Sequence, residues 1–288
     1  MIKVTVPATS ANCCVGFDCM GLALTWSSLF TFEESDTFHI EGVEPAYRNE
    51  HNLIVRAFRH AAEYLGKPMP TLSVKLETTI PFQRGLGSSA TCVVAGIYAA
   101  DLWYHAQLDR ETITRLATEM EGHPDNAAPA VYGNLCISNQ GDTLHTSVLP
   151  CADWKGLAMV PDYPVRTKEA RKVLPASIPH QQASKQVAHA MMFVQALQTG
   201  RQDILLENAV DYLHQPYRKK LIKEFDAVHD LCTAAGVPMW ISGSGSTMLA
   251  VSMSAAEIDH IKNEVETRFG ITCRPVQIAR KGASAVYE

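Results

Sequence analysis

Hydrophobic and polar residues alternate in several short segments of the first 150 residues, a pattern that predicts β-strands. Residues 71–80 are the clearest case, because Leu72, Val74 and Leu76 alternate with polar side chains, as in a strand with one exposed face. We expect the first strand of the chain to break at Pro7, because proline cannot donate to a strand ladder. Further strands are expected at residues 23–34 and 37–43, with a closing hairpin at 134–140 and 143–150.

Apolar residues at helical spacing occupy the segments between these strands. Residues 52–66 predict a helix that ends at its final glycine. Residues 109–122 predict a second helix, with Asp109 as its N-cap and Gly122 as its stop. A third helix, apolar over most of its length, begins near Leu86.

From about residue 152 the predicted elements follow a β-α-β-β-α-β-like order with extra helices. Strands are expected at 155–162, 238–245, 246–252 and 272–278, and helices at 167–175, about 180–235 and 255–270. We therefore expect an α+β protein of two domains, 1–151 and 152–288, that share an extensive interface. The first half is mixed α/β and the second ferredoxin-like.

The composition is that of an ordinary globular protein, with 47% hydrophobic and 19% charged residues. The net charge of −5 offers no basic surface to a nucleic acid or an anionic membrane. No basic segment followed by an apolar one opens the chain, and the apolar run after Ala90 is interrupted at Asp101, too early for a membrane span. We expect a cytoplasmic protein that binds any phosphorylated ligand with local groups, without nucleic-acid or membrane partners.

The eight cysteines contain no Cys-x-x-Cys pair, so neither a zinc ribbon nor a thioredoxin-like motif is indicated. Several lie in apolar runs, which is typical of packed thiols in a reducing compartment. Cys13, Cys14 and Cys19 lie close together in the sequence, but no histidine stands near them at ligand spacing. We favour packing over a metal site for these three.

The segment Gly85-Leu86-Gly87-Ser88-Ser89-Ala90 precedes the apolar helix and has the composition of a phosphate loop. No Gly-Lys-Ser or Gly-Lys-Thr occurs in the chain, which excludes a Walker loop. The segment matches G-x-G-x-x-G/A, but the preceding strand alternates and "PFQR" intervenes, unlike a dinucleotide-binding fold. Two interpretations remain. In the first, the N–H groups at the helix N-terminus bind a polyphosphate. In the second, Ser88 or Ser89 only caps the helix.

Four segments resemble a known family of small-molecule kinases. Residues 80–91, "IPFQRGLGSSAT", are similar to the phosphate loop of the GHMP kinases, the family of galactose, homoserine, mevalonate and phosphomevalonate kinases. "PATSANCCVGFDCMGLAL" at 7–24 and "EGHPDNAAPAVYGN" at 121–134 resemble signatures of its homoserine kinase branch. "ISGSGSTMLA" at 241–250 resembles the glycine-rich C-terminal motif. The match spans nearly the whole chain, which implies the two-domain GHMP-kinase-like fold with a nucleotide-binding N-terminal half.

The resemblance implies phosphorylation of the side-chain hydroxyl of L-homoserine by ATP with magnesium, and a possible homodimer. The implied phosphate loop consists of Pro81, Arg84, Gly85, Leu86, Gly87, Ser88, Ser89 and Ala90. Asn52 is implied to lie toward the adenosine, and Ser89 and Glu121 to bind the magnesium ion. A carboxylate at a helix C-terminus is disfavoured by the helix dipole, so Glu121 is either functional there or a solvated helix end.

Homoserine carries an ammonium, a carboxylate and a hydroxyl group. By resemblance, Asn12 and Asp18 hold its amino end, Arg171 and Arg218 hold its carboxylate, and His123 lies near it. A guanidinium group matches a carboxylate bidentately. The alternative for the two arginines is that they are solvated side chains on helices.

The homoserine branch carries asparagine, here Asn126, where related kinases use an aspartate base. Asparagine cannot accept a proton, which implies catalysis by positioning and charge stabilisation. Thr167 is implied to contact the reacting hydroxyl, or else caps the helix that follows it. Asp125 is the nearby carboxylate that could act as a base instead.

Four positions depart from the family pattern: the neighbours Cys13 and Cys14, Gln83 in the phosphate loop, and Ser246 where proline is usual. Two other functions stay open. One is a different small-molecule kinase of the family. Its substrate would be anionic, and Asp18 would repel it. The other is an ATP-binding sensor without turnover, which has no need of Ser89 and Glu121 as metal ligands.

Overall fold

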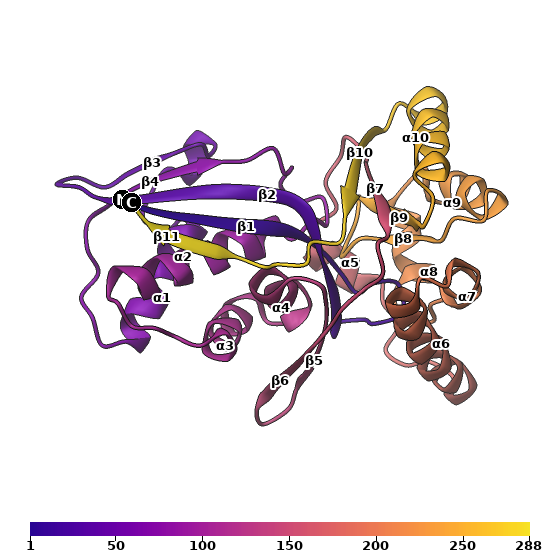
Figure 1. The fold of residues 1–288 in the computed structure, drawn as a ribbon, viewed down its shortest axis with the longest axis horizontal. Coiled ribbons are helices and arrows are strands. Elements are labelled where there is room, and N and C mark those ends of the chain that lie inside the picture. Colours follow the sequence, from indigo (N-terminus) through magenta and orange to yellow (C-terminus); the bar gives the residue numbers. More distant parts are fainter.

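Two β-sheets organise the chain, one in each half (Figure 1). The computed structural model describes residues 1–288. The first sheet has seven strands, in the order β11-β1-β2-β4-β3, with the hairpin β5–β6 attached through β2. Helices α1–α4 lie along one face of this sheet (Figure 1). The elements of this half are β1 (Ile2–Ala11), β2 (Met20–Glu34), β3 (His39–Glu41), α1 (Leu53–Tyr64), β4 (Leu72–Glu77), α2 (Ser88–Trp103), α3 (Arg110–Glu121), α4 (Pro124–Tyr132), β5 (Leu135–Gln140), β6 (Leu144–Leu149) and β11 (Ser284–Tyr287).

The second sheet has four antiparallel strands in the order β10-β7-β9-β8. The expected β-α-β-β-α-β order with extra helices is confirmed, and the whole is the two-domain α+β fold that the sequence predicts. The elements are β7 (Lys155–Val160), α5 (Thr167–Lys172), α6 (His180–Thr199), α7 (Gln202–Asn208), α8 (Gln215–Arg218), α9 (Phe225–Ala234), β8 (Met239–Ile241), β9 (Met248–Ser252), α10 (Ala255–Phe269) and β10 (Thr272–Gln277), with single 3-10 turns at Pro45–Tyr47 and Lys219–Leu221.

Strand β1 does not break at Pro7, so that prediction is wrong. Pro7 lies opposite Ser27 of β2, and the register shifts between Pro7 and Thr9, which marks a β-bulge. A bulge accommodates the missing N–H of a proline without ending the strand. The strand therefore continues through Thr9 to Ala11, and Asn12 follows directly after its end.

The chain does not end in the second sheet. After β10 it returns to the first sheet, where β11 pairs antiparallel with β1 and Ile2 lies opposite Tyr287. The two termini lie side by side as a result (Figure 1). Strand β11 was not predicted from the sequence, because four residues are too few to establish an alternating pattern. The domain division at residues 151 and 152 stays a prediction, and β11 belongs to the first sheet by its hydrogen bonds.

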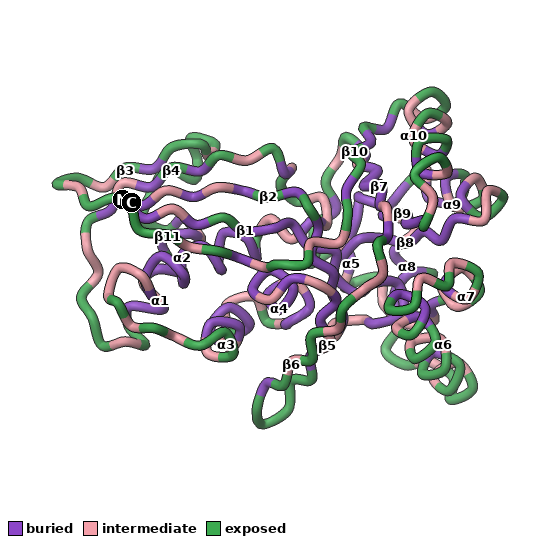
Figure 2. Tube along the Cα trace, in the orientation of Figure 1, coloured by how far each residue is buried: buried purple, intermediate pink, exposed green.

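The core consists of three clusters of buried side chains, and one of them joins the two sheets. Figure 2 shows buried residues, in purple, in both halves of the chain. The cluster between the sheets joins Leu22 of β2 to Phe193 of α6 and Trp240 of β8. Cys13 and Cys14 belong to the same cluster, and burial raises the pKa of both thiols, so they pack as core side chains. None of the helices combines the length and the apolar composition that crossing a bilayer requires.

Candidate active site

A cavity of about 490 Å³ lies among segments of both halves. Only 4 of its 21 lining residues are hydrophobic, so it suits a charged ligand. Most of the residues that the sequence analysis singled out line it: Asn12, Asp18, Gly85, Gly87, Ser88, Ser89, Glu121, His123, Asn126, Thr167, Arg171 and Arg218.

A second cavity of about 520 Å³ adjoins the first. The two share the lining residues Leu53, Gln83, Ser88 and Ser89. The second cavity has more apolar walls, which include Val43, Phe82 and Pro164. The phosphate-loop serines thus stand between a polar chamber and a partly apolar one.

Asn52 lines the second cavity, but its side chain already has protein partners. Its Oδ1 accepts the N–H of Ile54 at 2.9 Å and caps α1, and its Nδ2 donates to the carbonyl of Tyr47 at 2.9 Å. Both interactions shape the cavity wall. A contact between Asn52 and an adenosine stays a prediction.

No side chain caps the N-terminus of α2, so the capping alternative for Ser88 and Ser89 is wrong. The N-cap residue is Gly87, in the left-handed conformation, and the two serines form the first turn. The first N–H groups of a helix have no partner within it, and they carry the positive end of its dipole. The geometry suits an anion in the adjoining cavity.

The glycines of this loop are required by close packing as well as by backbone conformation. Gly87 has φ +65°, and a Cβ on it would lie 1.9 Å from Thr9 Oγ1. Gly85 has φ +75°, and a Cβ there would lie 2.1 Å from the carbonyl oxygen of Ser242. The loop is therefore pressed against β1 and against the segment after β8, and no side chain fits at either position.

Three members of the predicted phosphate loop do not line either cavity: Pro81, Leu86 and Ala90. Leu86 and Ala90 are buried. Arg84 lines the second cavity. Gln83 takes a left-handed φ of 56° and its carbonyl accepts the N–H of Val165 at 3.3 Å, so this departure from the family pattern is accommodated.

Glu121 ends α3 and is half-buried rather than solvated. Ser89 Oγ donates to Glu121 Oε1 at 2.6 Å, and burial raises the pKa of this carboxyl group. A hydroxyl and a carboxylate oxygen thus lie together at the start of α2. No group of three or more His, Cys, Asp or Glu side chains could hold a metal ion by itself. Two protein oxygens fit a magnesium ion that takes its other ligands from phosphates and water.

His123 and Asp125 form a pair at the N-terminus of α4. The Nδ1 of His123 is hydrogen-bonded to Oδ1 of Asp125, which is buried. This hydrogen bond raises the pKa of His123 above its ordinary value, against the opposing effect of burial. The carboxylate of Asp125 is thus engaged by the imidazole.

Asn126 is held in place by β1. Its Oδ1 accepts a hydrogen bond from Thr9 Oγ1 at 2.7 Å. The Nδ2 of the same amide has no protein partner and is free to donate. Thr9 was not among the predicted site residues; it lies directly after the bulge in β1.

Asp18 and Arg171, 153 residues apart in the sequence, form a bidentate ion pair. Arg171 Nη1 donates to Asp18 Oδ2 at 2.9 Å, and Nη2 donates to Oδ1 at 2.7 Å. Asn12 fixes the same loop, because its Oδ1 accepts the N–H of Asp18 at 3.0 Å. Both Asn12 and Asp18 have positive φ angles, 67° and 59°.

Arg218 is 2% exposed, so the alternative of a solvated helix arginine is wrong for this residue. Its Nε donates to the carbonyl of Ala170 at 3.2 Å and its Nη1 to that of Gly243 at 3.0 Å. Burial, and then the charge of Arg171, lower the pKa of Arg218 to about 10, so the group stays cationic at neutral pH. No carboxylate forms an ion pair with Arg218. The carboxylate of Asp18 is paired with Arg171 instead.

Comparison with known proteins identifies the family in which these features occur. The chain matches the GHMP kinases N terminal domain over residues 52–134 and the GHMP kinases C terminal domain over residues 193–271. The homoserine kinase of Gloeobacter violaceus is 40% identical to it over 264 residues, 86% of this chain and 87% of that protein.

The chain belongs to the GHMP kinases. This GHMP kinase is also 38% identical to the homoserine kinase of Caldicellulosiruptor bescii over 272 residues, 91% of this chain and 89% of that protein. The crystal structure of a homoserine kinase from Cytophaga hutchinsonii superimposes with a TM-score of 0.88 at 28% identity and covers 99% of this chain and 97% of that one. GHMP kinases use ATP.

Two corrections complete the site of this GHMP kinase. Thr167 is the first residue of α5, whose N-cap is Arg166 without a side-chain hydrogen bond, so the capping alternative for Thr167 is wrong.

Phe17 was not predicted as a site residue, although it stands next to Asp18 in the segment at 7–24. Its ring centroid lies 5.6 Å from Cζ of Arg171 and 5.0 Å from Cζ of Arg218. It therefore stacks against both cations.

Proposed function

We propose that this GHMP kinase transfers the γ-phosphoryl group of ATP to the side-chain hydroxyl of L-homoserine. The observation that carries the proposal is that Asp18 lines the polar cavity together with Arg171 and Arg218, so one acidic and two basic side chains lie at its substrate end. A zwitterionic amino acid needs an anion for its ammonium group and cations for its carboxylate. The homoserine kinases that share 38–40% identity with the chain support the same substrate.

The substrate end of the cavity is matched to a zwitterion. Asp18 would take the ammonium group with Asn12, and Arg171 and Arg218 would take the carboxylate bidentately. In the structure Arg171 and Asp18 neutralise each other. A zwitterion between them satisfies both charges, whereas a dianionic alcohol would meet the carboxylate of Asp18 at a cost in free energy.

The nucleotide end is formed by α2 and the second cavity. The β- and γ-phosphates of ATP would lie at the N-terminus of α2, near Gly87, Ser88 and Ser89, with the adenosine in the partly apolar cavity. Ser89 and Glu121 would hold a magnesium ion, which supplies charge neutralisation to the phosphates when it is bound.

The reacting hydroxyl would be oriented by Asn126, whose amide is itself fixed by Thr9. Asn126 cannot accept a proton, and the nearest carboxylate, Asp125, is hydrogen-bonded to His123. The raised pKa of His123 works against that ring as a base, because below its pKa the ring already carries the proton. A loose phosphoryl-transfer transition state requires little help from a base.

Steady-state release of ADP tests this proposal. We expect turnover with L-homoserine and at least about a hundredfold lower efficiency with 4-hydroxybutyrate, which lacks the ammonium, or 3-aminopropan-1-ol, which lacks the carboxylate. Arg218→Ala should lower the efficiency with homoserine roughly 30- to 100-fold and leave the efficiency with 3-aminopropan-1-ol nearly unchanged.

Two results would contradict the assignment. Faster turnover of a phosphorylated or ammonium-free alcohol would indicate a different kinase of the family. Tight ATP binding without ADP release with any alcohol would indicate a nucleotide sensor.

A further inference from the structure

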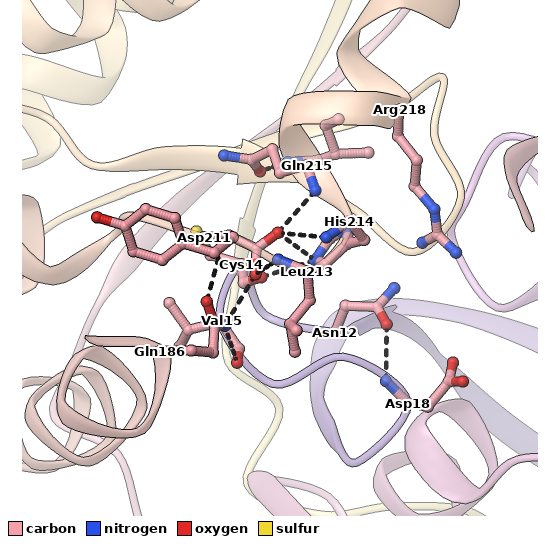
Figure 3. Close-up of polar contacts among 12 residues, drawn as sticks. Asn12, Cys14, Val15, Asp18, Gln186, Asp211, Leu213, His214, Gln215 and Arg218 are labelled. Carbon is pink, nitrogen blue, oxygen red and sulfur yellow. Dashed lines mark hydrogen bonds and ion pairs between the residues drawn. The ribbon is translucent and has the colours of Figure 1, made fainter. Parts of the chain in front are cut away.

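A buried polar cluster, made of Gln186, Asp211, His214 and Gln215, lies next to the loop that carries Asn12 and Asp18 (Figure 3). None of the four residues lines either cavity. The centre of the cluster is Asp211, in the segment between α7 and α8. Asp211 is 5% exposed, and no positively charged lysine or arginine pairs with it. Its carboxylate instead accepts four hydrogen bonds from neutral donors, which is an unusually complete set for one side chain.

The first role of this cluster is to hold the short helix that carries Arg218. Asp211 Oδ2 accepts the N–H groups of His214 at 2.8 Å and Gln215 at 2.7 Å, and Oδ1 accepts that of Leu213 at 3.1 Å. These three bonds fix the first turn of α8, which ends at Arg218 only three residues after Gln215. A shift of this turn moves the guanidinium group with it.

Gln215 ties the same helix to the glycine-rich segment after β8. Its Oε1 accepts the N–H of Ile241 at 2.9 Å. Two residues further on, the carbonyl of Gly243 accepts hydrogen bonds from both Arg218 and Asn12. The cluster thus reaches the substrate side chains of both halves through one carbonyl group.

The second role is to hold the loop that carries Asn12 and Asp18. His214 Nε2 is hydrogen-bonded to the carbonyl of Cys14 at 2.6 Å. Gln186 Nε2 donates both to the carbonyl of Val15 at 2.7 Å and to Asp211 Oδ1 at 2.8 Å. Figure 3 draws these contacts between the loop and the segment that contains Asp211.

This loop needs external support because its backbone is strained. Asn12, Cys13, Cys14 and Asp18 all have positive φ angles, between 42° and 67°. Non-glycine residues in this conformation are strained, and they persist only where the surrounding structure holds them there. The bonds from His214 and Gln186 fall at the centre of this strained stretch.

The ring of His214 adds a third contact, to Phe17. The two rings stack at 5.4 Å with 25° between their planes, and His214 is fully buried. Burial lowers the pKa of His214, so the ring is neutral, with the proton on Nε2 that the carbonyl of Cys14 requires. Phe17 in turn lies against the guanidinium groups of Arg171 and Arg218. The orientation of the buried His214 ring therefore influences the positions of both guanidinium groups through Phe17.

We propose that Asp211 and His214 are positioning residues of the substrate site, which align the cations on one half with the loop of Asn12 and Asp18 on the other. Neither residue contacts a cavity. Both act through groups that do, and they act on the amino-acid end rather than on the phosphate loop. This inference rests on the proposed function for the identity of the amino acid.

The test compares two buried carboxylates. Asp211→Asn replaces one of the two acceptor oxygens with an NH₂ group. In either orientation of the amide, this NH₂ group faces N–H donors that the carboxylate oxygen had accepted. Asp101→Asn is the matched control, because Asp101 is 8% exposed, accepts the N–H of Leu108 at 2.8 Å and lines neither cavity. Affinities for L-homoserine and for ATP are measured separately by calorimetry, together with KM, kcat and the thermal midpoint.

We expect Asp211→Asn to weaken homoserine binding about tenfold or more, while ATP affinity changes less than about twofold and kcat at saturation less than about threefold. Asp101→Asn should lower the thermal midpoint without changing either affinity. His214→Phe keeps a ring against Phe17 but removes the donor to Cys14, and should also weaken homoserine binding selectively. It provides the answer should Asp211→Asn fail to fold.

The proposal is overturned if homoserine affinity is unchanged in the folded variants, or if homoserine and ATP affinities fall together as in general loosening of the fold. A wild-type protein that binds ATP but no homoserine overturns the proposed function instead. The two failures are therefore distinguishable in the same set of titrations.

Discussion

Several charged side chains of the site are held out of water, and each has a specific reason for its ionisation state. Arg218 is buried without a carboxylate of its own, which is costly unless a ligand supplies the anion. Asp125 is buried against His123, and the half-buried Glu121 is kept beside a hydroxyl group by one hydrogen bond. At the scale of single residues, the ionisation state of each charged group depends on the partner that contacts it.

Glu121→Gln tests the metal site at the level of one atom. The change keeps the size of the side chain but removes a hard anionic ligand, so we expect kcat to fall at least about a hundredfold at millimolar magnesium. Raised magnesium should restore only part of the rate, and the thermal midpoint should change little. ADP release across a magnesium series is the measurement. Wild-type turnover at ordinary magnesium would exclude Glu121 as a ligand.

The ionisation of His123 offers a second test at this scale. The largest influence on its pKa is the hydrogen bond to the carboxylate of Asp125, which raises the pKa above the ordinary 6.5, while burial lowers it. Asp125→Asn removes the hydrogen bond to a carboxylate and the charge of that carboxylate, while burial and the charge of Arg171 still lower the pKa of the ring, so we expect this pKa to fall. Proton–carbon NMR of the His123 ring, assigned with His123→Gln, measures both values.

The same shift predicts a pH dependence with a definite sign. A group whose pKa is raised by folding stabilises the native state fully below its unfolded pKa, and loses that contribution as the pH rises through the folded value. The stability that His123 gains from Asp125 should therefore be lost above pH 6.5, not below it. An unchanged titration of His123 in Asp125→Asn would contradict the assigned pair.

At the scale of elements, helix termini and strand ends carry the site. Ser89 at the start of α2 is hydrogen-bonded to Glu121 at the end of α3, and Thr9 near the end of β1 is hydrogen-bonded to Asn126 in the first turn of α4. Helix starts concentrate unpaired N–H groups, and strand ends lead into loops that can turn side chains toward a ligand. The sheets themselves fix the distances between these ends.

Removal of β11 is the prediction for this scale. Deletion of residues 284–288 leaves β1 as an edge strand and removes its ladder with β11. A loss of about 2–4 kcal/mol should lower the thermal midpoint by roughly 5–10 °C, while the affinity for ATP is retained.

Glu288→Gln is the control for that deletion. It removes only the exposed ion pair with Lys3, at 2.6 Å, which is worth at most about 1 kcal/mol. Differential scanning calorimetry compares the two variants with the wild type. A deletion that behaves like Glu288→Gln would mean that β11 contributes nothing to the sheet.

The whole molecule is held together by the cluster of buried side chains that both halves share. The substrate charges come from both halves as well, with Asp18 from the first and Arg171 from the second. Because the same interface builds a core and a site, we expect the two halves to unfold together. A homodimer and a cytoplasmic location stay predictions.

Phe193→Ala tests this coupling. Phe193 is fully buried, and its ring meets that of Trp240 edge-on at 5.4 Å. Its loss should lower the free energy of unfolding by about 3–5 kcal/mol. Hydrogen exchange in β1 and in β9 should respond at the same urea concentration, although Phe193 lies in only one half.

Met191→Ala is the control on the same helix, because Met191 is 69% exposed and should change stability by less than about 0.5 kcal/mol. If β9 loses protection in Phe193→Ala while β1 keeps its own midpoint, the halves are independent and the shared cluster is not a common core.

Local patterns determined much of this structure in advance. The alternation around Val74 indicated β4, and Asp109 and Gly122 marked the ends of α3, because side-chain periodicity and helix caps act over only a few residues. The phosphate-loop segment before α2 was evident for the same reason. These features depend on neighbours within one turn or one strand, which the sequence displays directly.

Tertiary structure decided the rest. Pro7 continues a strand because β2 accommodates the bulge, and β11 exists because β1 offers an open edge. Arg218 is buried and Asp18 is paired because segments about 150–200 residues apart meet at one cavity. Burial and charge pairing depend on which segments come together in space, and neither periodicity nor capping carries that information. The sequence by itself therefore determined which residue types and local elements were available, while packing of the two halves decided which charges face one another.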